Sequence, residues 1–252
     1  MMAKLYFGFP DIHFPNHDPV AYSVAMKAHK ILRPDVTICG NDLFDNTPFS
    51  RWGVKTFREE EFMSSDWQKN ALDPAMRHLD TVQKHTKKIL FLEGNHDAWL
   101  ERWAVSLGQM GHAIYPMLSV KNHVLKGRDI EYHLEGEYIP LNDSLIVVHG
   151  WSIAKHAASV HLQKAKPTSV IFHHTHRQQL DTHRNYLNDK QVQAMSPGCL
   201  CKFQPVWRNG DPTAWTHGFW IAYVGKTSYT AYMVAIADGR CILPDGTEVR
   251  VR

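Results

Sequence analysis

Histidine, aspartate and asparagine side chains occur in five short blocks whose spacing suits metal binding. In chain order the blocks are Asp11-x-His13, Asn41-Asp42-x-x-Asp45, Gly94-Asn95-His96-Asp97, His149-Gly150 and His174-x-His176. Imidazole nitrogens bind Zn, Mn and Fe, whereas carboxylate and amide oxygens suit harder cations. In an extended segment the side chains of residues i and i+2 point the same way, so each D-x-H or H-x-H pair is expected to bind one ion. The blocks therefore predict a site for divalent cations.

Each block follows a short apolar run that predicts a buried strand. These runs cover residues 5–9, 36–39, 89–92, 145–148 and 170–172. In open α/β sheets, ligands bind outside the carboxyl ends of the strands. We therefore expect the five blocks to meet in space, although they are spread over residues 11 to 176.

The remaining pattern predicts a mixed α/β protein. Apolar spacing predicts helices over residues 20–32, 98–105 and 152–164, and mostly helical structure over 46–88, where Pro74 opens a second helix. Residues 106–140 are expected to be irregular apart from β structure near 130–134. After residue 191 we expect strands at 191–194, 219–224 and 229–237, then a terminal hairpin or tail from Arg240. No repeat or linker is visible, so residues 1–252 are predicted to form one domain.

Composition excludes several classes of protein. The chain has 252 residues, of which 44% are hydrophobic and 21% charged, so extensive disorder is excluded. No apolar run approaches the ~20 residues of a membrane helix, and Lys4 comes too early for a signal peptide; a cytoplasmic location without membrane contact is expected. Four Cys do not form a disulfide scaffold, and 17 His against 15 Gly indicate metal ligation or proton transfer. The net charge of +3 leaves nucleic-acid binding to a local patch.

The order of the five blocks resembles the signature of the calcineurin-like metallophosphoesterase superfamily. That signature runs D-x-H, G-D-x-x-D, G-N-H-D/E, H and G-H-x-H, and its counterparts cover roughly residues 5–177 of this chain. The chain looks most similar to the compact phage and bacterial members. The resemblance implies a four-layer α/β/β/α sandwich with two divalent metal ions at the strand ends, Mn before Fe, Zn or Mg.

The resemblance also assigns roles by position. One metal would be held by Asp11, His13, Asp42 and His176. The other would be held by Asp42, Asn95, His149 and His174, so that Asp42 bridges the two ions. A hydroxide shared by the metals would attack phosphorus in line, and His96 would donate a proton to the leaving group or stabilise its charge. Arg177 is expected to bind a phosphate oxygen.

Two aspartates are expected to lie beside the ligands without binding a metal. Asp45 and Asp97 are candidates for orienting imidazole rings, with helix capping as the alternative for Asp97.

Three positions depart from the family pattern. Asn41 and His173 each stand where the signature has Gly, and Asn tolerates left-handed backbone better than most residues. Asn46 stands where serine/threonine protein phosphatases of the superfamily have Arg, which argues against that branch.

Three functions stay open at this point. The favoured one is a phosphodiesterase or nuclease, in which Trp52, Trp67, Trp99 or Trp103 stack on bases or simply pack in the core. The second is a phosphomonoesterase acting on a nucleotide or a phosphoprotein, and the third is a non-catalytic scaffold. An amidohydrolase barrel is a weaker rival, because the regular β–α repeats of a barrel are missing. The sequence leaves the oligomeric state open.

Overall fold

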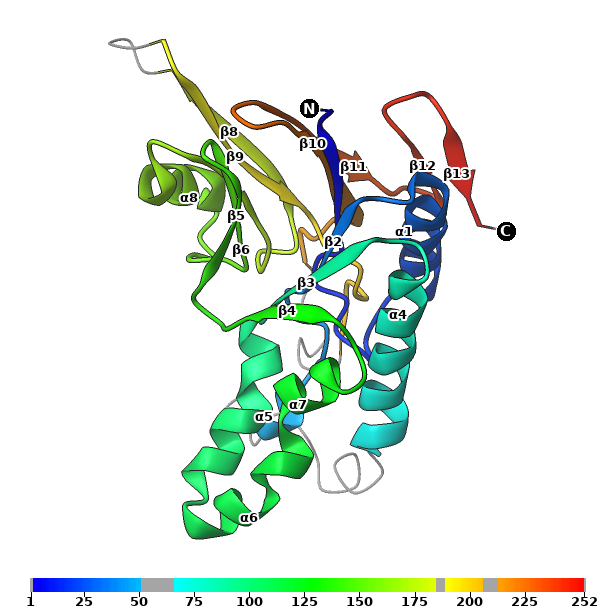
Figure 1. Cartoon of the computed structure of the whole chain (residues 1–252), viewed down its shortest axis with the longest axis vertical. Coiled ribbons are helices and arrows are strands. Elements are labelled where there is room, and N and C mark those ends of the chain that lie inside the picture. The colour runs from blue at the N-terminus through cyan, green and yellow to red at the C-terminus, as the bar shows by residue number, and fades with distance from the viewer. Residues whose placement is uncertain (1, 51–65, 185–188, 206–212, 252) are drawn as a thin grey trace.

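The computed structural model describes residues 2–50, 66–184, 189–205 and 213–251. Two large β-sheets lie face to face at the centre of these residues, and helices cover their outer faces (Figure 1). A separate two-stranded hairpin, β12–β13, lies near the C-terminus. The predicted terminal hairpin is thereby confirmed; its strands are β12 (Arg240–Ile242) and β13 (Glu248–Arg250).

The first sheet has six strands in the order β11-β10-β1-β2-β3-β4. Its strands are β1 (Lys4–Gly8), β2 (Val36–Gly40), β3 (Lys88–Leu92), β4 (Ile130–His133), β10 (Gly218–Val224) and β11 (Tyr229–Ala235). β1 to β4 are parallel, and β10 and β11 extend the sheet in antiparallel fashion. The parallel strands therefore present their carboxyl ends at one edge.

The second sheet has five strands in the order β5-β6-β7-β9-β8. Its strands are β5 (Tyr138–Asn142), β6 (Leu145–Val148), β7 (Ser169–Phe172), β8 (Gln178–Arg184) and β9 (Gln191–Pro197). β6, β7 and β9 are parallel, whereas the outer strands β5 and β8 are antiparallel to their neighbours. The carboxyl ends of β6 and β7 again point the same way.

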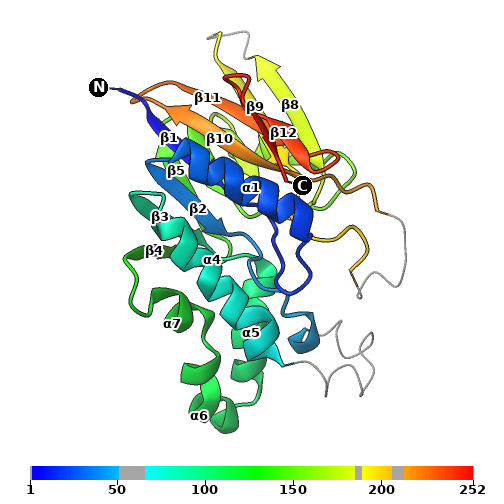
Figure 2. The same cartoon turned by 90° about the vertical axis from the view of Figure 1, so that its right-hand side faces the viewer.

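Alternating side chains build three apolar layers between four layers of structure. Along β1, Phe7 packs against the helices and Tyr6 faces the second sheet; Phe91 and Leu90 repeat this on β3, as the two-residue period of a strand requires. Helices α1, α4 and α7 cover the first sheet (Figure 2), whereas α8 packs on the outer face of the second (Figure 1). The predicted α/β/β/α sandwich is confirmed.

The helices are mostly short. They are α1 (Pro19–Leu32), α4 (Asp73–Gln83), α5 (Asn95–Ser106), α6 (Gln109–Leu118), α7 (Val120–Leu125) and α8 (Ala157–Ala165), with a 3-10 turn at Thr47–Phe49 and a π-helical turn at Gln68–Leu72. Pro74 lies in the first turn of α4, as predicted. Residues 51–65 of the predicted helical stretch 46–88, including Trp52, lie outside the described residues. No described helix has the length and apolar character to cross a bilayer.

The prediction that residues 106–140 are mostly irregular is wrong, because this segment holds α6, α7 and the start of β5, whereas the β structure predicted near 130–134 is confirmed as β4. Gly108, Gly111 and Pro116 suggest a loop but serve the helical hairpin α5–α6. Gly108 adopts a left-handed φ of 60° directly before α6. At Gly111 a Cβ would lie 1.6 Å from the Ala104 carbonyl oxygen, so only Gly allows α6 to approach α5 this closely. Strand β8 is also absent from the predictions; its residues are mostly exposed and carry no apolar alternation.

Candidate metal centre

All five polar blocks meet at the carboxyl ends of β1, β2, β3, β6 and β7. β1 ends three residues before Asp11, and β2 ends two residues before Asp42. His149 directly follows β6, and α5 begins at Asn95 close after β3. Because the facing sheets share this edge, residues far apart in sequence come into contact, as the sequence predicts.

Asp11, His13, Asp42 and His176 form the first cluster. His176 Nε2 lies 3.2 Å from His13 Nε2 and 3.2 Å from Asp11 Oδ1. His13 Nε2 lies 3.7 Å from Asp42 Oδ2. Asp11, His13 and Asp42 are essentially inaccessible to solvent, so their donor atoms face one another and not water.

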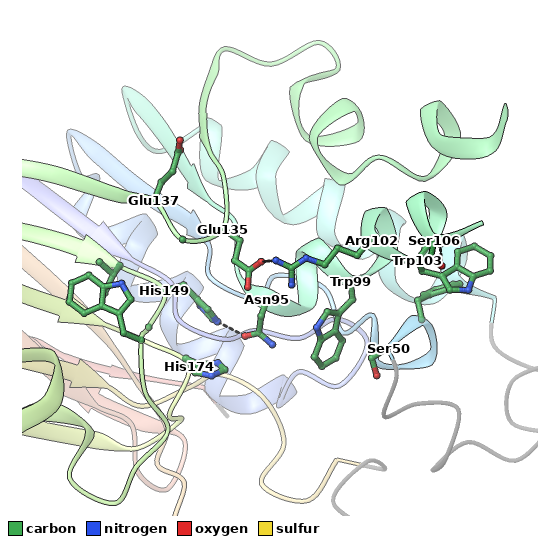
Figure 3. Close-up of a pocket in the computed structure, with 15 residues that line it drawn as sticks. Ser50, Asn95, Trp99, Arg102, Trp103, Ser106, Glu135, Glu137, His149 and His174 are labelled. Carbon is green, nitrogen blue, oxygen red and sulfur yellow. Dashed lines mark hydrogen bonds and ion pairs between the residues drawn. The ribbon is translucent and has the colours of Figure 1, made fainter. Parts of the chain in front are cut away.

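Asp42, Asn95, His149 and His174 form the second cluster. His149 Nε2 lies 2.8 Å from Asn95 Oδ1 and 3.2 Å from Asp42 Oδ2. The rings of His149 and His174 have centroids 4.9 Å apart (Figure 3). Asp42 thus contributes to both clusters, and Asp42, His149 and His174 offer donor atoms within 4.8 Å of one another.

The loops that carry the ligands are not extended, contrary to the conformation expected for the D-x-H and H-x-H pairs. Six residues of the blocks have left-handed backbone: Asp11 (φ 39°), His13 (55°), Asn41 (51°), Asp42 (66°), His174 (70°) and His176 (57°). Such conformations cost of order 1 kcal/mol each for residues with a Cβ. The chain therefore stores backbone strain where its ligand side chains converge. Asn41, which replaces a Gly of the family pattern, adopts the expected left-handed turn.

Two glycines of the blocks provide close approach. A Cβ on Gly94 would lie 2.2 Å from Asp42 Oδ1, and a Cβ on Gly150 would lie 2.8 Å from His174 Cβ. Neither position has space for a side chain. Gly94 therefore lets the third block pack against Asp42, and Gly150 lets the fourth pack against His174.

Asp97 secures the backbone around Asp42. Its carboxylate accepts N–H groups from Asp42 (3.0 Å), Phe44 (2.9 Å) and Gly94 (2.9 Å). The Gly94 contact caps α5, which is the helix-capping role expected as the alternative for Asp97. The other two contacts tie α5 to the loop after β2, so Asp97 positions the loop, and its carboxylate forms no hydrogen bond with an imidazole of the described residues.

Asp45 contacts the imidazole that was assigned to the leaving group. His96 Nδ1 lies 3.2 Å from Asp45 Oδ1, and the Thr47 N–H donates to the same oxygen at 3.1 Å. The His96 ring stacks on Trp99 with a centroid distance of 3.8 Å and packs edge-on against His13 at 4.5 Å. His96 therefore lies beside the clusters with a fixed ring.

Asn46 and His173 have structural partners. Asn46 Nδ2 donates to the His96 carbonyl at 3.0 Å, and Asn46 Oδ1 accepts from Trp67 Nε1 at 2.8 Å. His173 is buried between the sheets, where Nδ1 donates to the Val148 carbonyl (3.1 Å) and Nε2 accepts from Trp220 Nε1 (3.0 Å). The larger residue at position 173 is accommodated between the sheets.

Electrostatics favours neutral imidazoles at His13, His174 and His176 and a protonated imidazole at His149, which faces Asp42. Burial lowers the pKa of His13, His174 and His176 to about 3. Burial by itself raises the pKa of Asp42, but His149 and His96 hold it well below its ordinary value. Against the effect of burial, Asp42 raises the pKa of His149 to about 9.

These groups fit divalent cations. Asp42 Oδ2 is buried and accepts no hydrogen bond of good geometry from the described residues, yet imidazole nitrogens of both clusters face it. Neutral imidazole, carboxylate and one amide oxygen are the donors that Mn, Fe and Zn accept. The described residues thus contain His/Asp clusters suited to metal ions, whose number and identity belong to the proposal below.

A cleft of about 720 Å³ opens beside the second cluster. Asn95, His149 and His174 line its inner end, and Trp99, Arg102 and Trp103 of α5 form one wall (Figure 3). Glu135 and Trp151 also line it. Trp67 instead packs on Phe44 and His123 away from the cleft.

Arg177 does not line this cleft. Its guanidinium donates to the carbonyls of Ile153 (3.1 Å) and Ala154 (2.7 Å), and its role toward phosphate stays a prediction. The sequence reasoning missed Arg102 and Glu135. A signal was available for Arg102, because it lies on the helix predicted at 98–105 and follows Asn95 by about two helical turns.

No family model and no curated protein matches this chain. Among solved structures it is similar to vacuolar protein sorting 29 from Cryptosporidium parvum, with a TM-score of 0.50 and 12% identity over 100% of both chains. It is also similar to Vps29 from Chaetomium thermophilum, with a TM-score of 0.49 and 11% identity over 98% of this chain and 90% of that chain. At such identity the similarity to the Cryptosporidium protein concerns the fold alone, and this fold is that of the metallophosphoesterases. The narrower likeness to phage and bacterial members stays a prediction.

Proposed function

We propose that this protein is a dinuclear metal-dependent phosphoester hydrolase, and that it acts as a phosphodiesterase or nuclease. The observation that supports the proposal most is the position of Asp42, whose carboxylate contacts both clusters. In this proposal Asp11, His13, Asp42 and His176 hold one cation, and Asp42, Asn95, His149 and His174 hold the other. Manganese is the favoured metal.

Two divalent cations held by these residues would supply positive charge that binds phosphate oxygens and would lower the pKa of a water molecule. The residues of the chain do the rest. Asp97 fixes the loop that carries Asp42, and the left-handed turns at Asp11 and His13 aim their side chains inward. His96 keeps Nδ1 toward Asp45, which leaves Nε2 to donate a proton to the departing oxygen.

A diester or nucleic acid is favoured over a monoester for two reasons. Asn46 replaces the Arg of the protein phosphatases and is fully used in holding His96 and Trp67. The cleft beside the second cluster is also large and walled by Trp99, Trp103 and Trp151, which offers more contact area than a simple phosphomonoester requires.

The test is a substrate panel on protein reconstituted with Mn²⁺, and with Fe²⁺, Zn²⁺ and Mg²⁺ in parallel. The panel compares bis(p-nitrophenyl) phosphate with p-nitrophenyl phosphate, and then uses linear and circular single-stranded DNA and RNA. We expect faster turnover of the diester. Preference for the monoester would favour a nucleotide or phosphoprotein phosphatase, and metal-loaded protein that hydrolyses nothing would favour a scaffold.

A further inference from the structure

One wall of the cleft carries an arginine between two tryptophans. Trp99, Arg102 and Trp103 lie at positions i, i+3 and i+4 of α5 and so share one helix face. The same helix begins with Asn95, a proposed metal ligand, so this face runs outward from the metal centre (Figure 3). The wall is therefore placed where a substrate continues beyond its reacting phosphate.

The aromatic rings of the wall are supported from behind. Trp99 stacks on His96 with a centroid distance of 3.8 Å, and Trp103 contacts the Phe49 ring at 5.3 Å with a 54° tilt. Four residues along a helix correspond to a rise of about 6 Å, so the two indoles extend from successive turns of α5. Both are partly exposed and line the cleft.

Arg102 forms an ion pair whose carboxylate a phosphate group can replace. Its side chain is 61% exposed and forms an ion pair with Glu135 across the cleft (Figure 3). Glu135 lies on the turn before β5, and its backbone N–H donates to the buried Glu93 carboxylate at 3.0 Å. Exposed ion pairs contribute little stability, so a phosphate can replace the Glu135 carboxylate at low cost.

We infer that this wall binds a single-stranded polynucleotide: Arg102 leaves Glu135 to bind a backbone phosphate, and bases stack on Trp99 and Trp103. The inference rests on the proposed function, since it extends the substrate outward from that reaction site. Unpaired bases expose the faces that stack on aromatic rings, whereas bases in a duplex do not. Glu137 also lines the cleft, and its negative charge repels anions. The phosphate contact is therefore assigned to Arg102 and not to a general positive charge of the cleft.

The experiment measures binding of fluorescein-labelled oligo-dT by anisotropy, using the full chain with added Ca²⁺ and a gel to verify that the DNA stays intact. We expect Arg102→Gln to weaken binding about tenfold and to reduce the salt slope by about 0.7, the value for one phosphate contact on a single strand. Trp103→Ala weakens binding, and Trp103→Phe restores most of it. Glu135→Gln tightens binding, because Arg102 loses its competitor.

Arg184→Gln is the matched control. Arg184 ends β8, is 58% exposed and pairs with Asp189, and its loss is expected to leave binding unchanged. Any of four results would overturn the inference. Two concern the variants: equal effects of Arg102→Gln and Arg184→Gln, or weaker binding by Glu135→Gln. Two concern the wild type: no binding of oligo-dT, or equal affinity for duplex DNA. Binding that follows Arg102 without any hydrolysis in the substrate panel would contradict the proposed function and leave the cleft assignment standing. Hydrolysis of a diester without Arg102-dependent binding of oligo-dT would contradict the cleft assignment and leave the proposed function standing.

Discussion

At the scale of single residues, Asp42 is the most informative side chain, because its carboxylate contacts both His/Asp clusters. Asp42→Ala is expected to remove both metal ions together, lowering the occupancy of each site by at least about tenfold. Elemental analysis of dialysed protein measures this directly. Variant protein that still holds two ions per chain would refute the bridging role.

His96 gives the complementary expectation. Its ring is oriented by Asp45 and stacked on Trp99, and it is not among the seven proposed ligands. His96→Ala should therefore keep the metal content and lower turnover of a diester by about 10²–10⁴-fold, the usual contribution of a general acid. Full activity in the variant, with metal content verified by elemental analysis, would exclude the proton-donor role.

Asn41 combines two unfavourable features in one buried residue. Its backbone is left-handed (φ 51°), and neither Nδ2 nor Oδ1 has a hydrogen-bond partner among the described residues. Asn41→Gly removes both, so we expect the free energy of unfolding to rise by about 1 kcal/mol. Asn41→Ala is the control, since it removes the amide but keeps a Cβ in the left-handed region. Chemical denaturation in which Asn41→Gly is less stable than the wild type would contradict this account.

At the scale of elements, Asp97 joins helix α5 to the loop after β2. Its carboxylate accepts three buried backbone N–H groups, which lose their partners in Asp97→Ala. We expect a loss of about 3 kcal/mol or more in the free energy of unfolding. Denaturant titration measures it, with Asp129→Ala, at an exposed position, as the control. Equal stability of the two variants would show that Asp97 does not secure this junction.

The elements that hold the candidate site were largely predictable, because its ligands come directly after short apolar strands. Parallel strands end at one edge, so His149 and Asp11 were expected to meet although they are far apart in the chain. The backbone of the blocks was not predictable from spacing: the left-handed turns at Asp11 and His13 depend on contacts with distant loops, such as the His13 N–H to the Asp42 carbonyl.

The cleft was less accessible to sequence reasoning. Arg102 and Glu135 come from a helix and a turn with no shared motif, and only the tertiary fold brings them together. Helix α6 was missed because Gly111 and Pro116 have low helix propensity. Tertiary packing of Gly111 against Ala104 overrides that propensity.

At the scale of the whole molecule, the core between the helices and the first sheet contains buried histidines that must stay neutral. His29 Nε2 lies 2.8 Å from Thr37 Oγ1, and His78 Nδ1 lies 3.1 Å from the Tyr22 hydroxyl. Burial lowers the pKa of His29 to about 4 and that of His78 to about 3. In the unfolded chain both titrate near 6.5.

The unfolded chain therefore binds more protons than the folded protein below pH 6.5. The contribution of each histidine is fully present above that pH and is lost as the pH falls toward about 4 for His29 and about 3 for His78. The free energy of unfolding should fall by about 1.4 kcal/mol per pH unit for each group within its window. Urea denaturation at a series of pH values measures this slope.

His78→Gln separates this effect from the titration of other groups. The variant keeps a polar side chain near Tyr22 but cannot be protonated, so its stability should depend less steeply on pH between about 3 and 6.5, by about 1.4 kcal/mol per unit. His183→Gln, at an exposed position of β8, should retain the slope of the wild type. If His78→Gln and the wild type lose stability in parallel on acidification, then His78 does not contribute to the pH dependence of the free energy of unfolding.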